Sequence, residues 1–69
     1  MIEIKLRDEY IKLGQALKAS GLAASGVEAK IVIQDGEVTV NGVVCTERGR
    51  KLHDGDTAGY QGETIKIVG

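Results

Sequence analysis

The stretch "SGVEAKIVIQDGEVTVNG", Ser25 to Gly42, decides which fold this chain can adopt. Ser25 and Glu28 have the spacing of a capping box, in which the Ser side chain caps the helix start and the Glu side chain reaches back. The apolar residues that follow recur at helical spacing, and Gly36 can take the left-handed conformation that closes a helix. The sequence therefore predicts a helix that begins after Ser25 and ends at Gly36.

The second half of the stretch predicts a β-hairpin. Residues 37–40, "EVTV", alternate polar and apolar, as a half-buried strand does. Asn41 and Gly42 form the strongest short hairpin signal, because both central positions of a type I′ turn need a positive φ. Residues 43–46, "VVCT", are then the return strand.

Before this stretch, the sequence predicts one strand and one helix. Residues 2–6, "IEIKL", alternate with period two and indicate a strand. Asp8 and Glu9 offer a cap to a helix over residues 10–20, and Gly21 suits its left-handed C-terminal position. Gly14 lies inside this helix at a cost of about 1 kcal/mol relative to alanine. Close packing or a nearby ligand would favour glycine there.

After the hairpin, "DGD" at Asp54–Asp56 marks a turn, and "TAGYQ" and "TIKIV" indicate two more strands around Gly62. The predicted order is β-α-α-β-β-β-β in a single domain, residues 1–69. We expect an α+β fold, with a two-helix, helix-turn-helix-like pair packed on a small, mostly antiparallel, curled sheet. The helix faces that would be buried contribute Leu13, Leu17, Ala29, Val32 and Ile33.

Composition narrows the class of protein. The chain has 69 residues and a net charge of −1, and its only cysteine, Cys45, excludes an internal disulfide. A lone thiol fits a reducing cytoplasm, and no apolar run approaches the roughly 18 residues of a membrane span. We expect a cytoplasmic protein that contacts no membrane, with a monomer as the default state. Two tyrosines argue against a module that stacks bases on several rings.

The residue types needed for catalysis are scarce. Cys45 and the only histidine, His53, are the single conceivable nucleophile–base pair. One Cys and one His do not supply a metal site, which needs several converging ligands. The glycines do not fall at the spacing of a phosphate-binding loop. The sequence predicts no enzyme, no metal and no cofactor, with Cys45 packed in the sheet and His53 in a solvated turn.

The Lys and Arg residues are clustered in the sequence, although the net charge of the chain is only −1. Arg48, Arg50 and Lys51 lie almost side by side, and between Tyr10 and Gln34 the only acid is Glu28. In extended chain, Arg48 and Arg50 would project to the same side. Six of the nine Lys and Arg residues belong to this distribution: Lys12, Lys18, Lys30, Arg48, Arg50 and Lys51.

These cations predict a phosphate-binding surface if the segment after the hairpin folds against the helices. Lys12 and Lys18 would diverge by about 120° on one helix. The free N–H groups at the helix start near Ser25 can hold a phosphate, and Gly26 would let it approach closely. Otherwise the charges form only a solvated run.

The signals fall in the order of one family's sequence pattern: Leu13, Leu17, Gly21-Leu22-Ala23, Ser25, Ala29, Val32, Ile33, Gly36, Val38-x-Val40-Asn41-Gly42 and Gly55-Asp56. This order resembles the S-four domain, an RNA-binding domain named after small-subunit ribosomal protein four. The match covers roughly residues 11–69. The details "IKLGQ", "SGVEAK" and "RGRKL" resemble its small stand-alone bacterial members. The resemblance implies an αL-type RNA-binding motif that binds structured RNA, ribosomal or transfer RNA, and possible association with the ribosome.

One departure from the family pattern affects the expected contacts. Many S-four domains follow the helix-opening Ser with an Arg that contacts RNA, whereas this chain has Gly26. We therefore expect Lys30 and the Arg48–Lys51 segment to make the main RNA contacts in its place. Gln15 would add hydrogen bonds to sugar or base edges. The predicted function is non-catalytic recognition of folded RNA through its shape and backbone.

Two other functions stay open. The "VNG" and "DGD" signals also resemble sulfur-carrier proteins of the ubiquitin-like grasp fold, but those end in a Gly-Gly tail and this chain ends "IKIVG". A protein-binding accessory domain would need an exposed apolar patch, for which Ile31 is the candidate.

Overall fold

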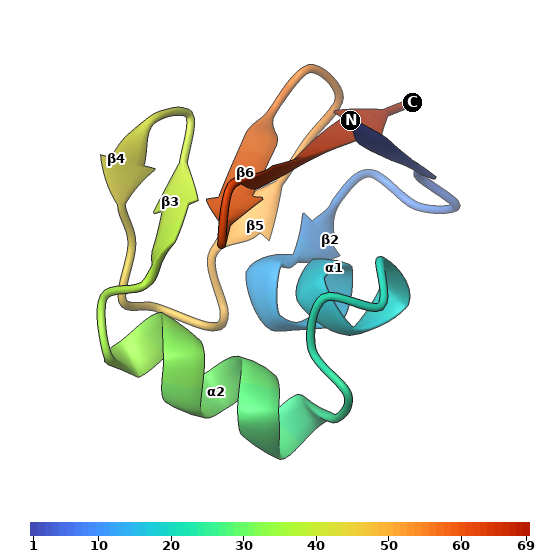
Figure 1. Cartoon of the computed structure of the whole chain (residues 1–69). Helices are drawn as coiled ribbons and strands as arrows, with labels where there is room; N and C mark the ends of the chain where they lie inside the picture. Colours follow the sequence, from blue (N-terminus) through green and yellow to red (C-terminus); the bar gives the residue numbers. More distant parts are fainter.

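A computed structural model describes all residues 1–69 and shows the expected α+β architecture (Figure 1). In chain order the elements are β1 (Ile2–Lys5), β2 (Ile11–Lys12), α1 (Leu13–Ala19), α2 (Gly26–Gln34), β3 (Val38–Val40), β4 (Val43–Val44), β5 (Lys51–Leu52), β6 (Thr57–Tyr60) and β7 (Glu63–Val68). Neither helix has the length and apolar character needed to cross a membrane.

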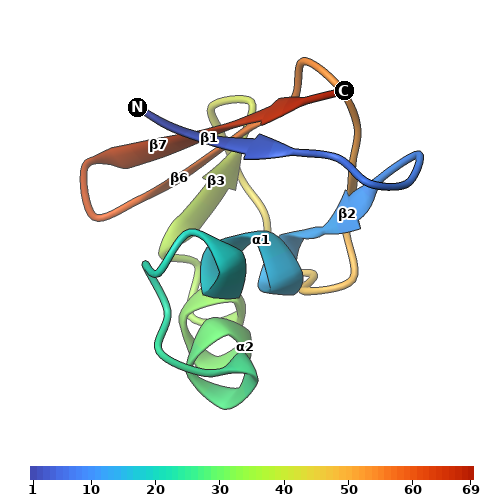
Figure 2. The same cartoon turned by 90° about the vertical axis from the view of Figure 1, so that its right-hand side faces the viewer.

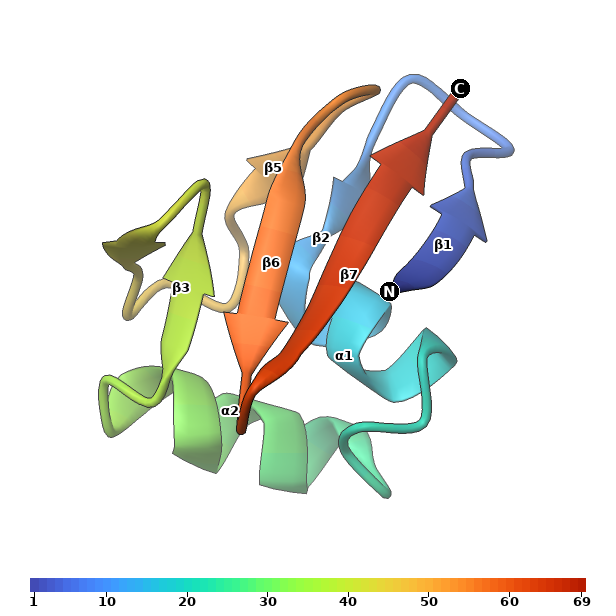
Figure 3. The same ribbon diagram turned by 45° about the horizontal axis from the view of Figure 1, so that its top comes forward.

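The strands form one five-stranded sheet and one separate ribbon. The sheet order is β1-β7-β6-β3-β4, and the ribbon pairs β2 with β5. Only β1 and β7 run parallel; the other paired strands are antiparallel. Figure 3 shows the sheet with the ribbon behind it. The prediction of a small, mostly antiparallel sheet is confirmed, and the ribbon is an addition that the sequence did not reveal.

The helices pack together on one side of the sheet (Figure 2). All five residues predicted for the buried helix faces are buried, because the hydrophobic periodicity correctly placed them on the side that meets the sheet. From the sheet, Val38, Ile65 and Ile67 complete this core. No charged or other polar residue is buried, so the core specifies the fold while polar chemistry stays at the surface.

Helix α2 begins and ends where the sequence predicts. Ser25 is its N-cap, and the Ser25 Oγ accepts a hydrogen bond from the Glu28 backbone N–H at 3.2 Å. The Glu28 carboxylate reaches back to the N–H of Ala24 at 3.3 Å, one residue earlier than in a standard capping box. After the helix, Gly36 has a φ of 78°. The predicted cap and stop are confirmed.

The predicted start of helix α1 is wrong. Asp8 and Glu9 do not cap it; the helix begins at Leu13, and Lys12 precedes it in extended conformation. Ile11 and Lys12 instead pair with Leu52 and Lys51 in the ribbon. The pairing wins because Ile11 packs against the core beside the buried Leu52, which a helical start at residue 10 would not allow. At the other end Gly21, with a φ of 81°, terminates α1 as predicted.

The hairpin turn is also confirmed, since Asn41 and Gly42 both have positive φ, 51° and 83°. The return strand is shorter than predicted: β4 contains only Val43 and Val44. Its partner β3 hydrogen-bonds to β6 on the other side, so β4 is the open edge of the sheet.

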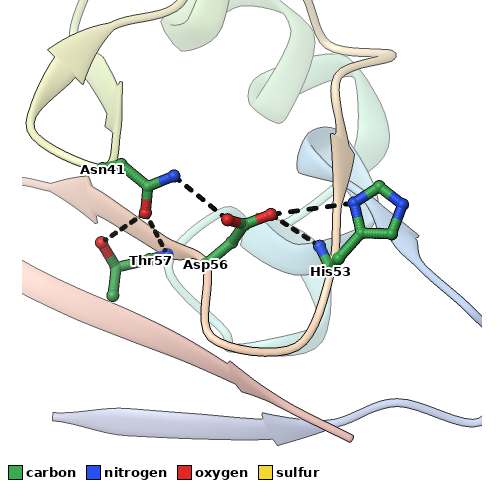
Figure 4. Close-up of polar contacts among 4 residues, drawn as sticks. All are labelled: Asn41, His53, Asp56 and Thr57. Carbon is green, nitrogen blue, oxygen red and sulfur yellow. Dashed lines mark hydrogen bonds and ion pairs between the residues drawn. The ribbon is translucent and has the colours of Figure 1, made fainter.

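A cluster of four polar residues ties this turn to the turn before β6; we call it the Asp56 cluster (Figure 4). The Asp56 carboxylate accepts hydrogen bonds from the His53 backbone N–H at 2.7 Å and from the Asn41 amide at 3.1 Å. The Asn41 side-chain oxygen accepts from the Thr57 N–H at 2.9 Å. The His53 N–H, and secondarily Asn41, hold the pKa of the Asp56 carboxyl below its ordinary value of 3.8. The cluster is therefore a structural clamp between loops that are distant in sequence.

Candidate nucleic-acid interface

Three of the predicted cations surround one surface depression. We call it the basic hollow; its volume is about 310 Å³, and its lining is Lys12, Gly14, Gln15, Lys18, Gly26, Arg48 and Gly49. The lining contains no acidic and no hydrophobic residue. Lys12 and Lys18 come from the continuous β2–α1 segment, and Arg48 comes from the loop between β4 and β5, thirty residues further along. The fold thus concentrates positive charge in a protein whose net charge is −1.

The Arg48 side of the hollow is held by the start of α1. The Leu13 N–H donates to the Arg50 carbonyl at 2.9 Å, and the Gly14 N–H donates to the Arg48 carbonyl at 3.0 Å. These bonds satisfy N–H groups that a helix start leaves without an intrahelical partner. A Cβ at Gly14 would lie 3.6 Å from the Arg48 carbonyl oxygen, which is ordinary contact. A Cβ would therefore fit, so close packing does not require glycine at this position. The Gly14 N–H bond is what positions the backbone of the Arg48 loop.

Gly26, the first residue of α2, also lines the hollow. The backbone N–H groups of Gly26 and Val27 precede the first intrahelical bonds and donate to no other group. Such free N–H groups, with the helix dipole, favour an anion. Gly26 adds no side chain above them. Ser25 does not line the hollow, because its hydroxyl caps the helix.

Lys12 and Lys18 meet at the hollow although helical rotation predicted that they would diverge. The rotation does not apply, because Lys12 lies in β2 and only Lys18 lies in α1. Gln15 stands between them, with its side-chain oxygen 3.4 Å from the Lys12 backbone N–H that donates to it. This contact leaves the amide NH₂ of Gln15 available as a donor to a ligand.

The other predicted site residues lie outside the hollow. Arg48 and Arg50 do not project together: the chain turns at Arg48-Gly49, and the Arg50 N–H bonds to the Glu47 carbonyl at 3.1 Å. Arg50 instead lines a depression beside the β3–β4 hairpin. Lys30 is exposed one helical turn beyond Gly26 on α2. The predicted single patch therefore divides into a central hollow and outlying cations.

Lys51 takes a position of its own in the ribbon. Its backbone lies directly opposite that of Lys12, a like-charge cross-strand pair that disfavours the ribbon unless an anion or another contact compensates. The Lys51 ammonium lies 4.9 Å from the centroid of the Tyr10 ring, a cation–π contact. The centroid of the His53 ring lies 6.1 Å from that of the Tyr10 ring.

A larger depression adjoins the basic hollow and was missed by the sequence reasoning. We call it the β1–α1 hollow; its volume is about 580 Å³, and its lining is Ile4, Lys5, Leu6, Arg7, Asp8, Tyr10, Ile11, Gln15, Lys18 and Ala19. Gln15 and Lys18 line both hollows. The available signal was the pair of cations Lys5 and Arg7, which follow the period of β1 but belong to no helix.

The two residues of the conceivable catalytic pair, Cys45 and His53, each contact a different partner. The Cys45 thiol donates to the Glu47 carbonyl at 3.7 Å, whereas the His53 ring lies 3.9 Å from the Asp56 carboxylate. No group of three or more His, Cys, Asp or Glu side chains converges anywhere in the chain.

The sequence pattern of the S4 domain, the S-four domain named above, matches residues 4–68. The chain belongs to the S4 domain family. It is 36% identical over 59 residues to YbcJ of Escherichia coli (strain K12), named as a candidate RNA-binding protein; the match covers 86% of this chain and 84% of YbcJ. It is 41% identical over 59 residues to RlbA of Bacillus subtilis (strain 168), named as a probable ribosome maturation protein, over 86% and 83% of the two chains.

The fold agrees with this membership. The solution structure of E. coli YbcJ, described as revealing an ALFAL motif involved in RNA binding, superimposes with a TM-score of 0.76 at 33% identity. The superposition covers 100% of this chain and 89% of YbcJ. The match stands against the sulfur-carrier alternative.

Proposed function

We propose that this S4 domain protein binds structured RNA, without catalysing a reaction, and that the basic hollow is the centre of its interface. The observation that carries the proposal is the lining of the hollow: three cations, exposed glycine backbone and one amide, with no acid. Two of its related proteins carry names or descriptions that connect them with RNA or with ribosome maturation. The bound RNA is then ribosomal or transfer RNA, and the site of action the cytoplasm, with the protein acting as a monomer.

The chemistry of the hollow suits a phosphodiester backbone. Lys12, Lys18 and Arg48 supply attraction that does not depend on sequence, and Arg48 can hold two phosphate oxygens at once. The free N–H groups of Gly26 and Val27 add directional bonds. Because the cations and Gly26 line one depression, several of these donors can bind the same stretch of backbone. Lys30, Arg50 and Lys51 extend the positive field beyond it.

The test is fluorescence anisotropy with a folded ribosomal RNA fragment and a duplex DNA of equal length, each at several salt concentrations. We expect preference for the RNA and a log–log salt slope of a few units, which corresponds to a handful of phosphate contacts. The control is the Lys66→Gln variant, which removes one cation from β7, away from both hollows. Equal affinity for both nucleic acids, or no binding by the folded protein, would contradict the proposal.

An apolar surface supports the protein-binding alternative, and it is larger than Ile31 alone. Val27 and Ile31 are exposed one turn apart on α2, and Val43 and Val44 are exposed on the edge strand. These residues do not adjoin the basic hollow's cations in any shared depression. A protein partner on Val43 and Val44 would therefore bind beside the basic hollow, whereas a partner on Val27 would lie next to the free N–H groups at the start of α2.

A further inference from the structure

The β1–α1 hollow differs in chemistry from the basic hollow that it adjoins. Ile4, Leu6 and Ile11 are partly buried apolar residues that pack against the core, and they line its floor. Tyr10 adds an aromatic ring that is 36% exposed. This is the chemistry of a site for a flat, largely apolar group. Its volume of about 580 Å³ falls in the range of small-ligand sites, roughly 300–1,000 Å³.

The polar residues around this floor indicate a negatively charged occupant. Lys5, Arg7 and Lys18 line the hollow together with a single acid, Asp8. None of the three cations forms an ion pair within 4.0 Å, since the only such contact in the chain joins His53 and Asp56. A flat apolar group that carries negative charge is the description of a nucleotide.

The two hollows are continuous, which indicates that the nucleotide belongs to the same RNA that the basic hollow binds. Gln15 and Lys18 line both depressions. A backbone held between Lys18 and Arg48 therefore leads directly past Gln15 into the β1–α1 hollow. The free NH₂ group of Gln15 lies at this junction, where it can donate to a base edge or a sugar oxygen.

The Tyr10 ring is held from the ribbon side before any ligand arrives. The Lys51 ammonium lies over one face at 4.9 Å, and the His53 ring is tilted against it at 52°. Fixing the ring in advance reduces the ordering cost of stacking a base against it. Lys51, which does not line the basic hollow, thus gains a role through Tyr10.

We propose that the β1–α1 hollow binds the base of an unpaired nucleotide that continues from the RNA held in the basic hollow. The inference rests on the proposed function and adds a preference to it: the RNA has a junction between a helical segment and a single strand. The base must be unpaired, because a base inside a helix exposes no face to an aromatic side chain.

The experiment compares three labelled RNA probes by anisotropy. The first is a hairpin with a blunt stem, the second is the same hairpin with a few unpaired nucleotides added at either end, and the third carries an extension of abasic sugar-phosphates. The abasic probe keeps the added charge and lacks the base. We expect the base-containing extension to tighten binding about tenfold over the blunt hairpin, as one stacked base does, and the abasic extension to recover only a small part of this gain.

Substitutions in the protein test whether the affinity gained from the added base arises in the β1–α1 hollow. Tyr10→Leu keeps an apolar side chain and should abolish the gain while leaving affinity for the blunt hairpin unchanged; Tyr10→Phe should keep it. Arg7→Gln, at an exposed position, should reduce affinity for the extended hairpin only, whereas its charge-matched control Lys66→Gln should not. If thermal melting shows that Tyr10→Leu is unfolded, the Arg7→Gln and Lys66→Gln pair decides.

The outcomes separate the two proposals. Equal affinity of the wild-type protein for all three probes, an abasic extension as effective as the normal one, or a full gain in folded Tyr10→Leu would each overturn the base-binding hollow. In those cases blunt-hairpin binding that is lost in Arg48→Gln, at a residue that lines the basic hollow alone, would still support the proposed function. Failure of the wild-type protein to bind any of the three probes would remove both proposals.

Discussion

The Asp56 cluster and the basic hollow differ in how many of their polar groups have a partner within the chain. In the Asp56 cluster, the carboxylate of Asp56 and the side-chain oxygen of Asn41 accept all their bonds from within the chain. In the basic hollow, the cations form no ion pair within 4.0 Å and the Gly26 N–H has no acceptor. Both clusters join loops that are distant in sequence, but only the first is complete without a ligand.

The contrast separates stability from binding. A polar cluster closed on itself stabilises the folded chain, because its hydrogen bonds, some of them to a charged carboxylate, form only in the folded state. A cluster of like charges left open opposes folding slightly and becomes favourable when an anion arrives. Substitutions in the Asp56 cluster should therefore change the melting temperature, and substitutions in the basic hollow should change affinity for RNA.

The largest expected effect is on affinity. Lys18→Glu combined with Arg48→Glu replaces two attractive contacts in the basic hollow with two repulsive ones, so RNA affinity should fall roughly a hundredfold, about 2.8 kcal/mol. The melting temperature should change little, because neither side chain forms an ion pair in the chain. Anisotropy and thermal melting, measured on the same samples, check both halves; a stable variant with wild-type affinity would rule out the hollow.

The next effect is on stability. Asp56→Asn removes a charged acceptor from the His53 N–H and the Asn41 amide, and should lower the free energy of unfolding by about 2 kcal/mol, as loss of hydrogen bonds to a charged group does. Urea denaturation at neutral pH measures this change. RNA affinity at a temperature where the variant is folded should stay within about twofold of wild type. A large loss of RNA affinity with unchanged stability would contradict this assignment, because it would place Asp56 in the RNA-binding surface.

The pH dependence of stability tests the same residue. The pKa of Asp56 in the folded protein lies below its ordinary value of 3.8, so the ionised carboxylate favours folding. Its contribution is present above that value and is lost as the pH falls through the lowered pKa. In Asp56→Asn the part of the acid destabilisation that arises below pH 3.8 should be reduced, which urea denaturation at a series of acid pH values would show.

A smaller effect is expected at the start of α2, where a residue that stabilises the helix adjoins the basic hollow. Ser25→Ala removes the side-chain cap of α2 and should cost about 1 kcal/mol of stability. The Gly26 N–H remains at the hollow, so the free energy of RNA binding should change by less than the free energy of unfolding. Thr46→Ala, at an exposed position outside the helices and strands, is the control, and a melting curve identical to wild type for Ser25→Ala would contradict the observed cap.

The smallest effect should come from a cation outside the hollow. Arg50→Gln removes the same charge as Arg48→Gln, but Arg50 lies beside the β3–β4 hairpin. We expect a loss of affinity of less than about threefold for Arg50→Gln, from the weakened long-range field, and a larger loss for Arg48→Gln. Equal losses measured by anisotropy would restore the single Arg48–Lys51 patch that the sequence predicted.

Local signals identified most of the framework. Ser25, Gly36 and Asn41-Gly42 act through backbone geometry and hydrogen bonds within a few residues, so their effects can be read from neighbours in the sequence. The residues of the helix faces were predicted correctly for a similar reason, since a helix places them at a fixed period. The error at Asp8 and Glu9 shows the limit: their capping potential is real, but Ile11 gains more by pairing with Leu52, a residue forty-one positions away.

By itself, the sequence determined the class of fold, the two helix ends that glycine closes, the hairpin turn, the resemblance to the S4 domain and the surplus of cations around the helices. The tertiary structure decided which cations meet. Arg48 joins Lys12 and Lys18 because the first N–H groups of α1 bind the Arg48 loop, and Arg50 leaves because that loop turns at Gly49. The physical reason is range: caps and turns depend on bonds between near neighbours, whereas a binding surface depends on long-range contacts that position side chains from separate segments.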